Sequence, residues 1–181
     1  MVEGLITGAI DVTTTELADR LVGGILPAGP ERLRTAGALG LPQVISLGAL
    51  DVVNFGPWET VPPVFRDRRL YRHNPQVTLM RTTPEECREL GEAIAARLNG
   101  GGGERCVVAP LRGFSALSTA GEPFYDAEAD LALIEALRSE LSPEVELIEL
   151  DADINQPPVA EVLVERFAGA YRGWRKQTVK A

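Results

Sequence analysis

Leu5-Ile6-Thr7-Gly8-Ala9-Ile10-Asp11-Val12-Thr13-Thr14-Thr15-Glu16-Leu17-Ala18-Asp19 joins a short apolar run to the start of a helix. The apolar run ends at Asp11, and Thr13-x-x-Glu16 matches the capping box, in which Thr and Glu side chains satisfy the first free amides of a helix. The stretch therefore predicts a strand over residues 1–10 and a helix over 16–22 that closes at Gly23-Gly24. In open parallel sheets, strand–loop–helix corners of this kind form the ligand crevice.

Strands and helices continue to alternate along the chain. We expect further strands at 44–47, 70–73, 106–111 and 145–150, and helices at 30–39, from 84, from 126 and from 157, with a frayed tail from Arg172. The strands read as continuous apolar runs, which is typical of a parallel sheet covered on both faces. The chain is thus predicted to form one α/β domain over residues 1–181, a Rossmann-like three-layer sandwich with a mostly parallel, doubly wound sheet.

Three segments differ in how clearly their sequence predicts their structure. Thr83-Pro84-Glu85-Glu86 combines a Thr cap, Pro at the first helical position and Glu at the third, and the helix after it carries its apolar residues at helical spacing. The helix from Asp126 is expected to bury Leu131 among its apolar positions. Residues 49–69, in contrast, show no convincing regular element. Loops of that length are usually functional or disordered, and the aromatic and branched residues here argue against disorder.

Composition limits the possible partners. The 181 residues are 45% apolar, enough for a sizeable core, and carry a formal charge of −8 with no Lys- or Arg-rich run. This charge argues against nonspecific nucleic-acid binding and against an anionic membrane surface. Cys87 and Cys106 form no CxxC pair, and no signal peptide or apolar span of about 18 residues is evident. These features predict a reduced, cytoplasmic protein with buried thiols.

Polar residues follow every predicted strand, and in a parallel sheet they would meet at one edge. The set is Asp11, Thr13, Thr14 and Thr15; Asp51 and Asn54; Arg72, His73, Asn74 and Arg81; Arg112 and Ser115; Asp151, Asp153 and Asn155. Three arginines in an acidic protein favour a carboxylate or phosphate ligand, because the guanidinium fork matches planar oxyanions. The alternative is that they pair internally with Asp11, Asp51 and Asp151.

Chemical roles follow from residue type. His73 is the only histidine and the candidate catalytic residue, with a structural role as its alternative. Ser115 could belong to a hydrolytic triad with His73, but its surroundings lack the second glycine of Gly-x-Ser-x-Gly, which favours a contact to an anionic ligand. Neither glycine-rich segment matches a nucleotide motif, and the sequence leaves the cofactor unknown. No metal site is predicted, because the aspartates have no diagnostic spacing; the alternative is a divalent metal held by oxygens of Asp11, Asp51 or Asp151. The candidate ligand-binding residues are Asp11, Thr13, Thr14, Asp51, Asn54, Asn74, Arg81, Arg112 and Ser115.

Four phrases carry a resemblance to a known family. They are Gly8-Ala9-Ile10-Asp11 through Asp19, Ser46-Leu-Gly48-Ala-Leu-Asp51 through Gly56, Tyr71-Arg-His-Asn-Pro75 through Thr82, and Pro110-Leu-Arg-Gly-Phe-Ser115. Over nearly its whole length the chain resembles the C-terminal half of uncharacterised protein family 0261, the Tm-one-like family that includes a plant tobamovirus resistance protein. The resemblance implies an α/β domain that follows an ATP-binding half absent here, so that half or a separate chain is an expected partner. It implies no settled reaction.

Two hypotheses of function follow. In the first, the domain binds a small anionic metabolite at the C-terminal edge of its sheet, as a catalytic or ligand-sensing half. In the second, it is a non-catalytic assembly or protein-interaction module, anchored by Phe55, Trp58 and Phe65 in the 49–66 loop, because aromatic residues often anchor interfaces. A homo-oligomer is expected in either case.

Overall fold

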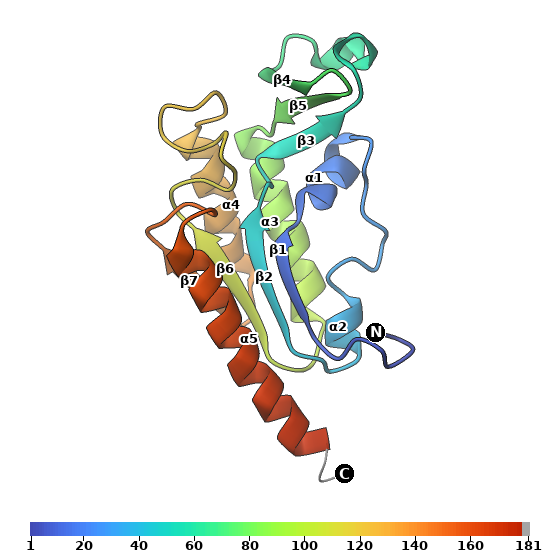
Figure 1. The fold of residues 1–181 in the computed structure, drawn as a ribbon, viewed down its shortest axis with the longest axis vertical. Helices are drawn as coiled ribbons and strands as arrows, with labels where there is room; N and C mark the ends of the chain where they lie inside the picture. Colours follow the sequence, from blue (N-terminus) through green and yellow to red (C-terminus); the bar gives the residue numbers. More distant parts are fainter. Residues whose placement is uncertain (179–181) are drawn as a thin grey trace.

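A four-stranded parallel sheet forms the centre of the computed structural model, which describes residues 1–178 (Figure 1). Its strands, in the spatial order β1-β2-β6-β7, are β1 (Ala9–Thr13), β2 (Gln43–Gly48), β6 (Arg105–Pro110) and β7 (Val145–Leu150). Every residue of β2 and β6 is buried, because each has a strand on both sides and helices over both faces. The parallel sheet predicted from the continuous apolar runs is confirmed.

Helices cover both faces of this sheet and complete three layers. Figure 1 shows α5 (Pro157–Thr178) crossing one face, while α3 (Pro84–Asn99) and α4 (Ala127–Glu140) lie against the other. The short helices α1 (Thr15–Val22) and α2 (Thr35–Ala38) precede β2. The strands follow one another across the sheet in chain order, so right-handed crossovers place the connecting helices on one face. Helix α5, which comes after the last strand, covers the opposite face. The predicted α/β sandwich is confirmed.

A second, antiparallel sheet stands beyond the carboxyl end of β2. Its order is β3-β5-β4, with β3 (Val52–Phe55), β5 (Val77–Arg81) and β4 (Leu70–Asn74), and two 3₁₀ turns, η1 (Trp58–Thr60) and η2 (Pro63–Phe65), lie between β3 and β4. The expectation that residues 49–69 lack regular structure was therefore wrong. The predicted strand at 70–73 exists, but it belongs to this small sheet. Strands of four or five residues are too short to show a clear period, so tertiary pairing decides them.

The two predicted capping boxes have different outcomes. At α3, the Thr83 hydroxyl accepts a hydrogen bond from the Glu86 amide at 3.2 Å, and the Glu86 carboxylate accepts one from the Thr83 amide at 2.8 Å. At α1, the cap is Thr14 instead of Thr13, and its side chain makes no capping bond. The Thr14 hydroxyl is buried and donates to the Ser46 carbonyl at 3.3 Å, because it lies between strand ends.

Several helices and strands begin or end at residues other than those predicted. Strand β1 begins at Ala9, so residues 2–6 are exposed instead of forming a strand. The predicted helix at 30–39 is reduced to α2, and α5 continues to Thr178 where a frayed tail was expected from Arg172. Residues 179–181 lie outside the described part.

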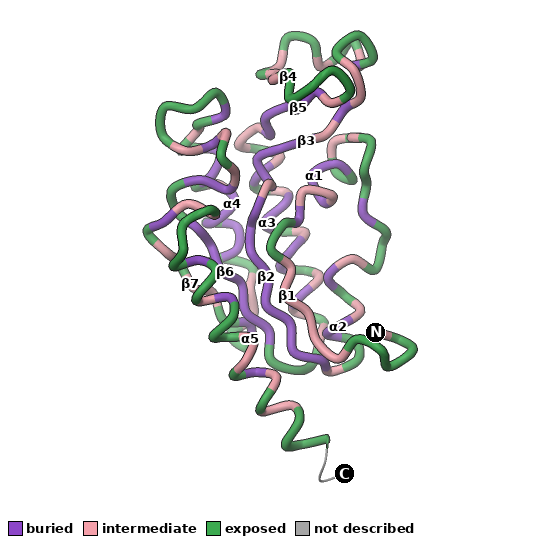
Figure 2. The backbone as a smooth tube through the Cα atoms, in the orientation of Figure 1, coloured by how far each residue is buried: buried purple, intermediate pink, exposed green. Residues whose placement is uncertain are grey.

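The core has two main parts, one on each face of the central sheet. Leu47, Ile94 and Leu133 belong to the larger cluster, on the α3 and α4 side, and Val44 and Leu163 to the smaller one beneath α5. Figure 2 shows this burial concentrated along the central strands. Leu131, predicted to be buried, is exposed, and Leu133 takes the core position. Within residues 1–178, no helix is long and apolar enough to cross a membrane.

Candidate functional site

A pocket of about 440 Å³ lies where the carboxyl edge of the central sheet meets the small sheet. Cavities of this size suit small metabolites. Residues from both sheets and from the loop after β6 line it: Thr15, Ala49, Val52, Asn54, Tyr71, His73, Val77, Leu79, Ser115, Ala116 and Leu117. The pocket therefore brings together three of the candidates predicted from the sequence, Asn54, His73 and Ser115.

The side chains of β4 point alternately toward the pocket and away from it. Successive side chains of a strand point to opposite faces, so Tyr71 and His73 line the pocket while Arg72 and Asn74 point away. The Arg72 guanidinium carbon lies 5.2 Å from the centre of the Trp58 ring, and the Asn74 side-chain oxygen accepts from the Gln76 amide at 2.8 Å. His73 is exposed, and its side chain makes no hydrogen bond to another of residues 1–178. Its imidazole is thus available to a ligand.

A hydrogen-bonded cluster holds one wall of the pocket. The buried Asp19 carboxylate accepts from the Asn54 amide at 2.6 Å and from the Leu26 amide at 2.9 Å. The Asn54 side-chain amide donates to the Thr15 hydroxyl at 3.1 Å, which donates in turn to the Val52 carbonyl at 2.9 Å. Burial raises the pKa of Asp19 against the opposing effect of these hydrogen bonds. The cluster fixes the start of α1 against β3.

The opposite wall holds a serine bonded to a buried aspartate. The Ser115 hydroxyl donates to the Asp51 carboxylate at 2.6 Å and accepts from the Leu117 amide at 3.1 Å. The other Asp51 oxygen is buried without a partner among the described residues, and burial raises the pKa of this carboxyl group. Because its hydrogen points to Asp51, Ser115 offers a ligand a lone pair and not a donor. Asp51 bonds directly to Ser115, which is not the Ser–His–Asp order of a hydrolytic triad.

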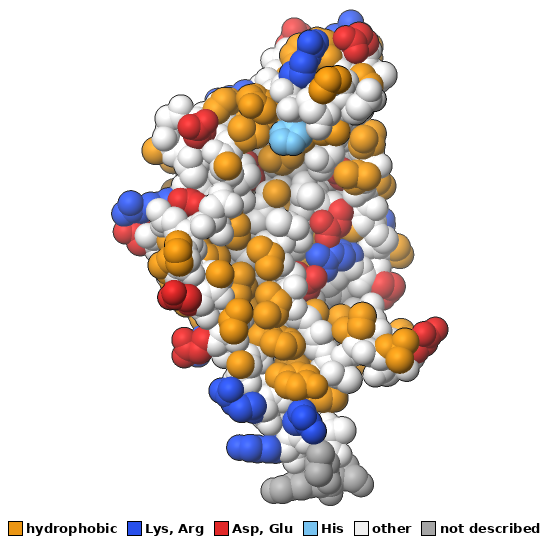
Figure 3. All heavy atoms as spheres, viewed as in Figure 1, with side chains coloured by type: hydrophobic (Ala, Val, Ile, Leu, Met, Phe, Trp, Pro, Cys, Tyr) orange, Lys and Arg blue, Asp and Glu red, His pale blue; other side chains and the backbone are white. Residues whose placement is uncertain are grey.

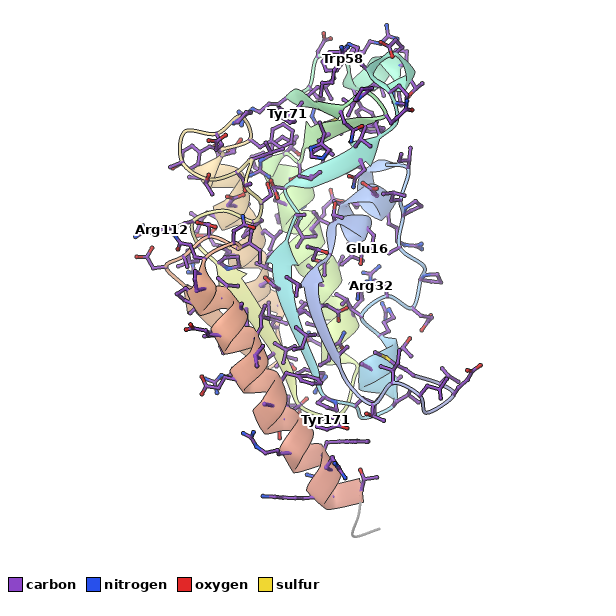
Figure 4. All side chains as sticks on the ribbon, in the orientation of Figure 1. Glu16, Arg32, Trp58, Tyr71, Arg112 and Tyr171 are labelled. Atoms are coloured by element: carbon purple, nitrogen blue, oxygen red, sulfur yellow. The ribbon has the colours of Figure 1, made fainter. Side chains whose placement is uncertain are left out.

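Five further candidates lie outside the pocket. Asp11 pairs with Arg32 at 2.7 Å, Thr13 is exposed at the end of β1, and Thr14 is buried. Asn74 is on the far side of β4, as described above. Arg112 forms a bidentate ion pair with Asp151, in which Nε and Nη2 donate to the two carboxylate oxygens at 2.5 and 2.6 Å. Figure 4 shows Arg112 and Arg32 on opposite flanks of the molecule. The predicted single cluster at the sheet edge is therefore divided.

Arg81 also lies outside the pocket, inside the protein. Its side chain is only 2% exposed, and it donates to the Phe124 carbonyl at 2.8 Å, to the Thr82 hydroxyl at 2.8 Å and to the Asp130 carboxylate at 2.5 Å. Every guanidinium nitrogen has a protein acceptor, so this arginine does not present a free donor to the pocket. Arg112 and Arg81 therefore follow the alternative expectation, in which the arginines pair with aspartates of the protein. Arg112 pairs with Asp151, as that alternative expected, whereas Arg81 pairs with Asp130.

Thr15 and Tyr71 line the pocket but were not among the sequence candidates. Thr15 belonged to the polar group after β1, and its position as first residue of α1 could have singled it out. Tyr71 could have been found from its two-residue spacing to His73, once the segment was assigned as a strand.

Comparisons with known proteins agree on one family. The sequence model described as "Uncharacterised protein family (UPF0261) C-terminal domain" matches residues 1–171. A UPF0261 protein of Clostridium tetani is 46% identical over 91% of this chain and 41% of its own length, and one of Rhizobium meliloti is 47% identical over 91% and 42%. The ToMV resistance protein Tm-1(GCR237) of Solanum lycopersicum is 41% identical over 91% of this chain and 22% of its own length. The chain thus spans about two fifths of the bacterial relatives and about a fifth of the tomato protein.

Proposed function

This chain belongs to the UPF0261 family, as its C-terminal domain, and from that premise we propose that it binds a small anionic metabolite in the pocket between its two sheets. One observation carries the proposal: Thr15, Asn54, His73 and Ser115, which come from four separate segments, converge on a single cavity of metabolite size. In the longer family members, this domain would then be the catalytic or ligand-sensing half.

The pocket walls suggest how such a ligand would lie. The first turn of α1 starts at Thr15, and free amides at a helix start favour negative charge. His73 adds a donor on the facing strand. Ser115 accepts a hydrogen bond, so a hydroxyl group on the ligand fits beside it. Val52, Leu79 and Leu117 form an apolar wall. A hydroxylated carboxylic acid with a short apolar part matches this arrangement.

The proposal is tested by calorimetric titration and thermal shift with sugar acids, keto acids and phosphates. A ligand at 100 times its dissociation constant stabilises the folded state by about 2.7 kcal/mol. Ser115→Ala should weaken binding about tenfold through one lost hydrogen bond. His73→Gln should lower any turnover by roughly 10²–10⁴-fold while binding persists.

Ser139→Ala is the matched control, because Ser139 is an exposed serine on α4 away from the pocket. Absence of stabilisation by any of these anions, both alone and with the preceding part of a relative supplied, contradicts the proposal. If His73→Gln leaves turnover intact, His73 loses its catalytic role and the pocket is a binding site only.

A second candidate function is assembly with another protein. Of the three expected anchors, Phe55 is buried and its ring centre lies 5.4 Å from that of Phe65, so these two pack internally and only Trp58 remains on the surface. A different surface favours assembly. Figure 3 shows apolar side chains gathered over the face that α5 shares with β1, and Val12 on that edge strand is 48% exposed. A second copy of the chain is the proposed occupant, and the ATP-binding half or a separate chain is the competing one.

A further inference from the structure

A second cavity, of about 600 Å³, lies between α4 and the segment that joins β6 to α4. It shares no lining residue with the candidate pocket. Its lining is Leu111, Arg112, Thr119, Ala120, Tyr125, Ala127, Asp130, Leu131, Ile134, Arg138 and Asp153. The proposed metabolite site therefore does not account for it.

The walls of this cavity are mainly apolar. Leu111, Tyr125 and Leu131 are exposed although they are large and apolar, and Ile134 closes the space toward the core. Leu131 is the residue whose spacing on α4 predicted burial. Together with Leu111 and Tyr125 it forms an exposed apolar surface at a cavity, which is a feature of ligand-binding grooves.

The charged groups at this cavity leave a carboxylate available. Arg112 and Arg138 at the rim are already paired, with Asp151 at 2.5 Å and with Glu149 at 2.7 Å. Asp130 is only 8% exposed, and one of its oxygens accepts from Arg81 at 2.5 Å. Its other oxygen accepts no hydrogen bond from residues 1–178.

The surrounding cluster has more carboxyl groups than guanidinium groups. Arg81 faces two buried carboxylates, Asp130 and Asp51, and the nearby Asp126 has Arg69 at 3.7 Å. Three carboxyl groups thus share two guanidinium groups, which leaves one carboxyl group without a cationic partner. A cationic group entering beside Asp130 would supply it, whereas an anion would meet no free arginine.

We propose that this cavity binds a small organic amine, with its ammonium group between the Asp130 carboxylate and the Tyr125 ring and its apolar body against Leu111, Leu131 and Ile134. A carboxylate contact and an aromatic face are the two features that proteins use to hold ammonium groups. The apolar walls select amines that carry a hydrocarbon chain or ring over simple cations.

The experiment is calorimetric titration of the chain with hexylamine, hexanol and hexanoate, which share one apolar chain and differ in charge. Hexylamine should bind at least tenfold more tightly than hexanol, and hexanoate should bind least. Leu131→Lys places a cation in the cavity at an exposed position, so it should fold normally and weaken hexylamine binding at least tenfold. Val164→Lys, at an exposed apolar position on α5, is the matched control and should bind as the wild type does.

Asp130→Asn should remove the preference for amine over alcohol. It also leaves Arg81 without its carboxylate, so circular dichroism checks the fold, and Leu131→Lys decides the question if the variant is unfolded. Equal affinity for hexylamine and hexanol, or unchanged amine binding in Leu131→Lys, overturns the proposal. His73→Gln should leave amine binding unchanged, and a loss there would assign the amine to the other pocket, which also overturns it.

Discussion

Three aspartates, Asp19, Asp51 and Asp130, keep their carboxyl groups out of water, and burial raises the pKa of each. For Asp130 the pKa rises from 3.8 to about 6, against the lowering effect of Arg81 and with small further increases from Asp51 and Asp126. A carboxyl group with a raised pKa keeps its proton in the folded state at a pH where the unfolded chain has lost it. Stability due to Asp130 is therefore fully present below pH 4 and is lost as pH rises to about 6.

Asp130→Asn tests this linkage because asparagine does not titrate. The free energy of unfolding of the wild type, relative to that of the variant, should fall by about 2–3 kcal/mol between pH 4 and pH 7. Urea denaturation at both values measures it, with exposed Asp67→Asn as the control. A wild type that gains stability over the variant as pH rises would show that pairing with Arg81 outweighs burial.

The predicted site residues come together only where strand ends fix their position. Asn54, His73 and Ser115 reach the pocket because each lies in, or just after, an element that ends there. Arginines could not be assigned in the same way. Whether Arg81 and Arg112 bind a ligand or an aspartate depends on Asp130 and Asp151, which are distant in the chain and come near only on folding.

At the scale of single elements, the two threonine motifs provide a direct comparison. Thr83→Ala removes a formed capping box and should lower the free energy of unfolding by about 1 kcal/mol. Thr13→Ala alters the matching motif, where no capping bond forms, and should change stability by less than about 0.5 kcal/mol. Chemical denaturation of both variants measures the difference. Equal losses would mean that the Thr13 motif also caps its helix in solution.

Helix packing predicts opposite outcomes for two helical glycines. A Cβ on Gly91 would lie 2.6 Å from the Leu133 carbonyl oxygen and 2.7 Å from the Ala136 Cβ, because α3 and α4 pack closely there. Gly91→Ala should therefore destabilise by about 1–3 kcal/mol despite its better helix propensity. Gly169→Ala, in α5 with nothing within 4 Å, should stabilise by about 0.5–1 kcal/mol. Thermal denaturation of both variants measures this, and a stabilised Gly91→Ala would show that the two helices can separate at low cost.

Helices and strands could be predicted where the residues that determine them lie in one continuous stretch of sequence. Helix α3 has its cap, its first-turn Pro and its apolar spacing in one stretch, and the sequence predicted it accurately. Strands β3 and β5 have four and five residues, and what makes them strands is pairing such as that of Val52 with Arg81. The sequence of one short strand does not show which other strand it will pair with.

For the whole molecule, the uneven covering of the central sheet bears on assembly. A single helix, α5, covers one face, and the outer edge of β1 has no neighbouring strand among the described residues. If a second copy packs on this face, light scattering should report a dimer that Val12→Lys converts to monomer at micromolar concentration, because a buried charge without a partner is costly. Trp58→Ala, at the distant tip of the small sheet, should leave the dimer intact. A monomeric wild type contradicts the second-copy assignment and leaves a different chain as the occupant.

The small antiparallel sheet is built from one continuous stretch, residues 52–81, whereas the central sheet joins distant ones, such as Gln43 with Arg105. Hairpins form in about 1–10 μs, while parallel pairing across long loops is slower. The β4–β5 hairpin should thus form early, and the central sheet should close late. The candidate pocket needs both, with Tyr71 from the first and Ser115 from the loop after β6. A ligand of that pocket should consequently slow unfolding without accelerating folding, since its binding site is completed only after the rate-limiting step.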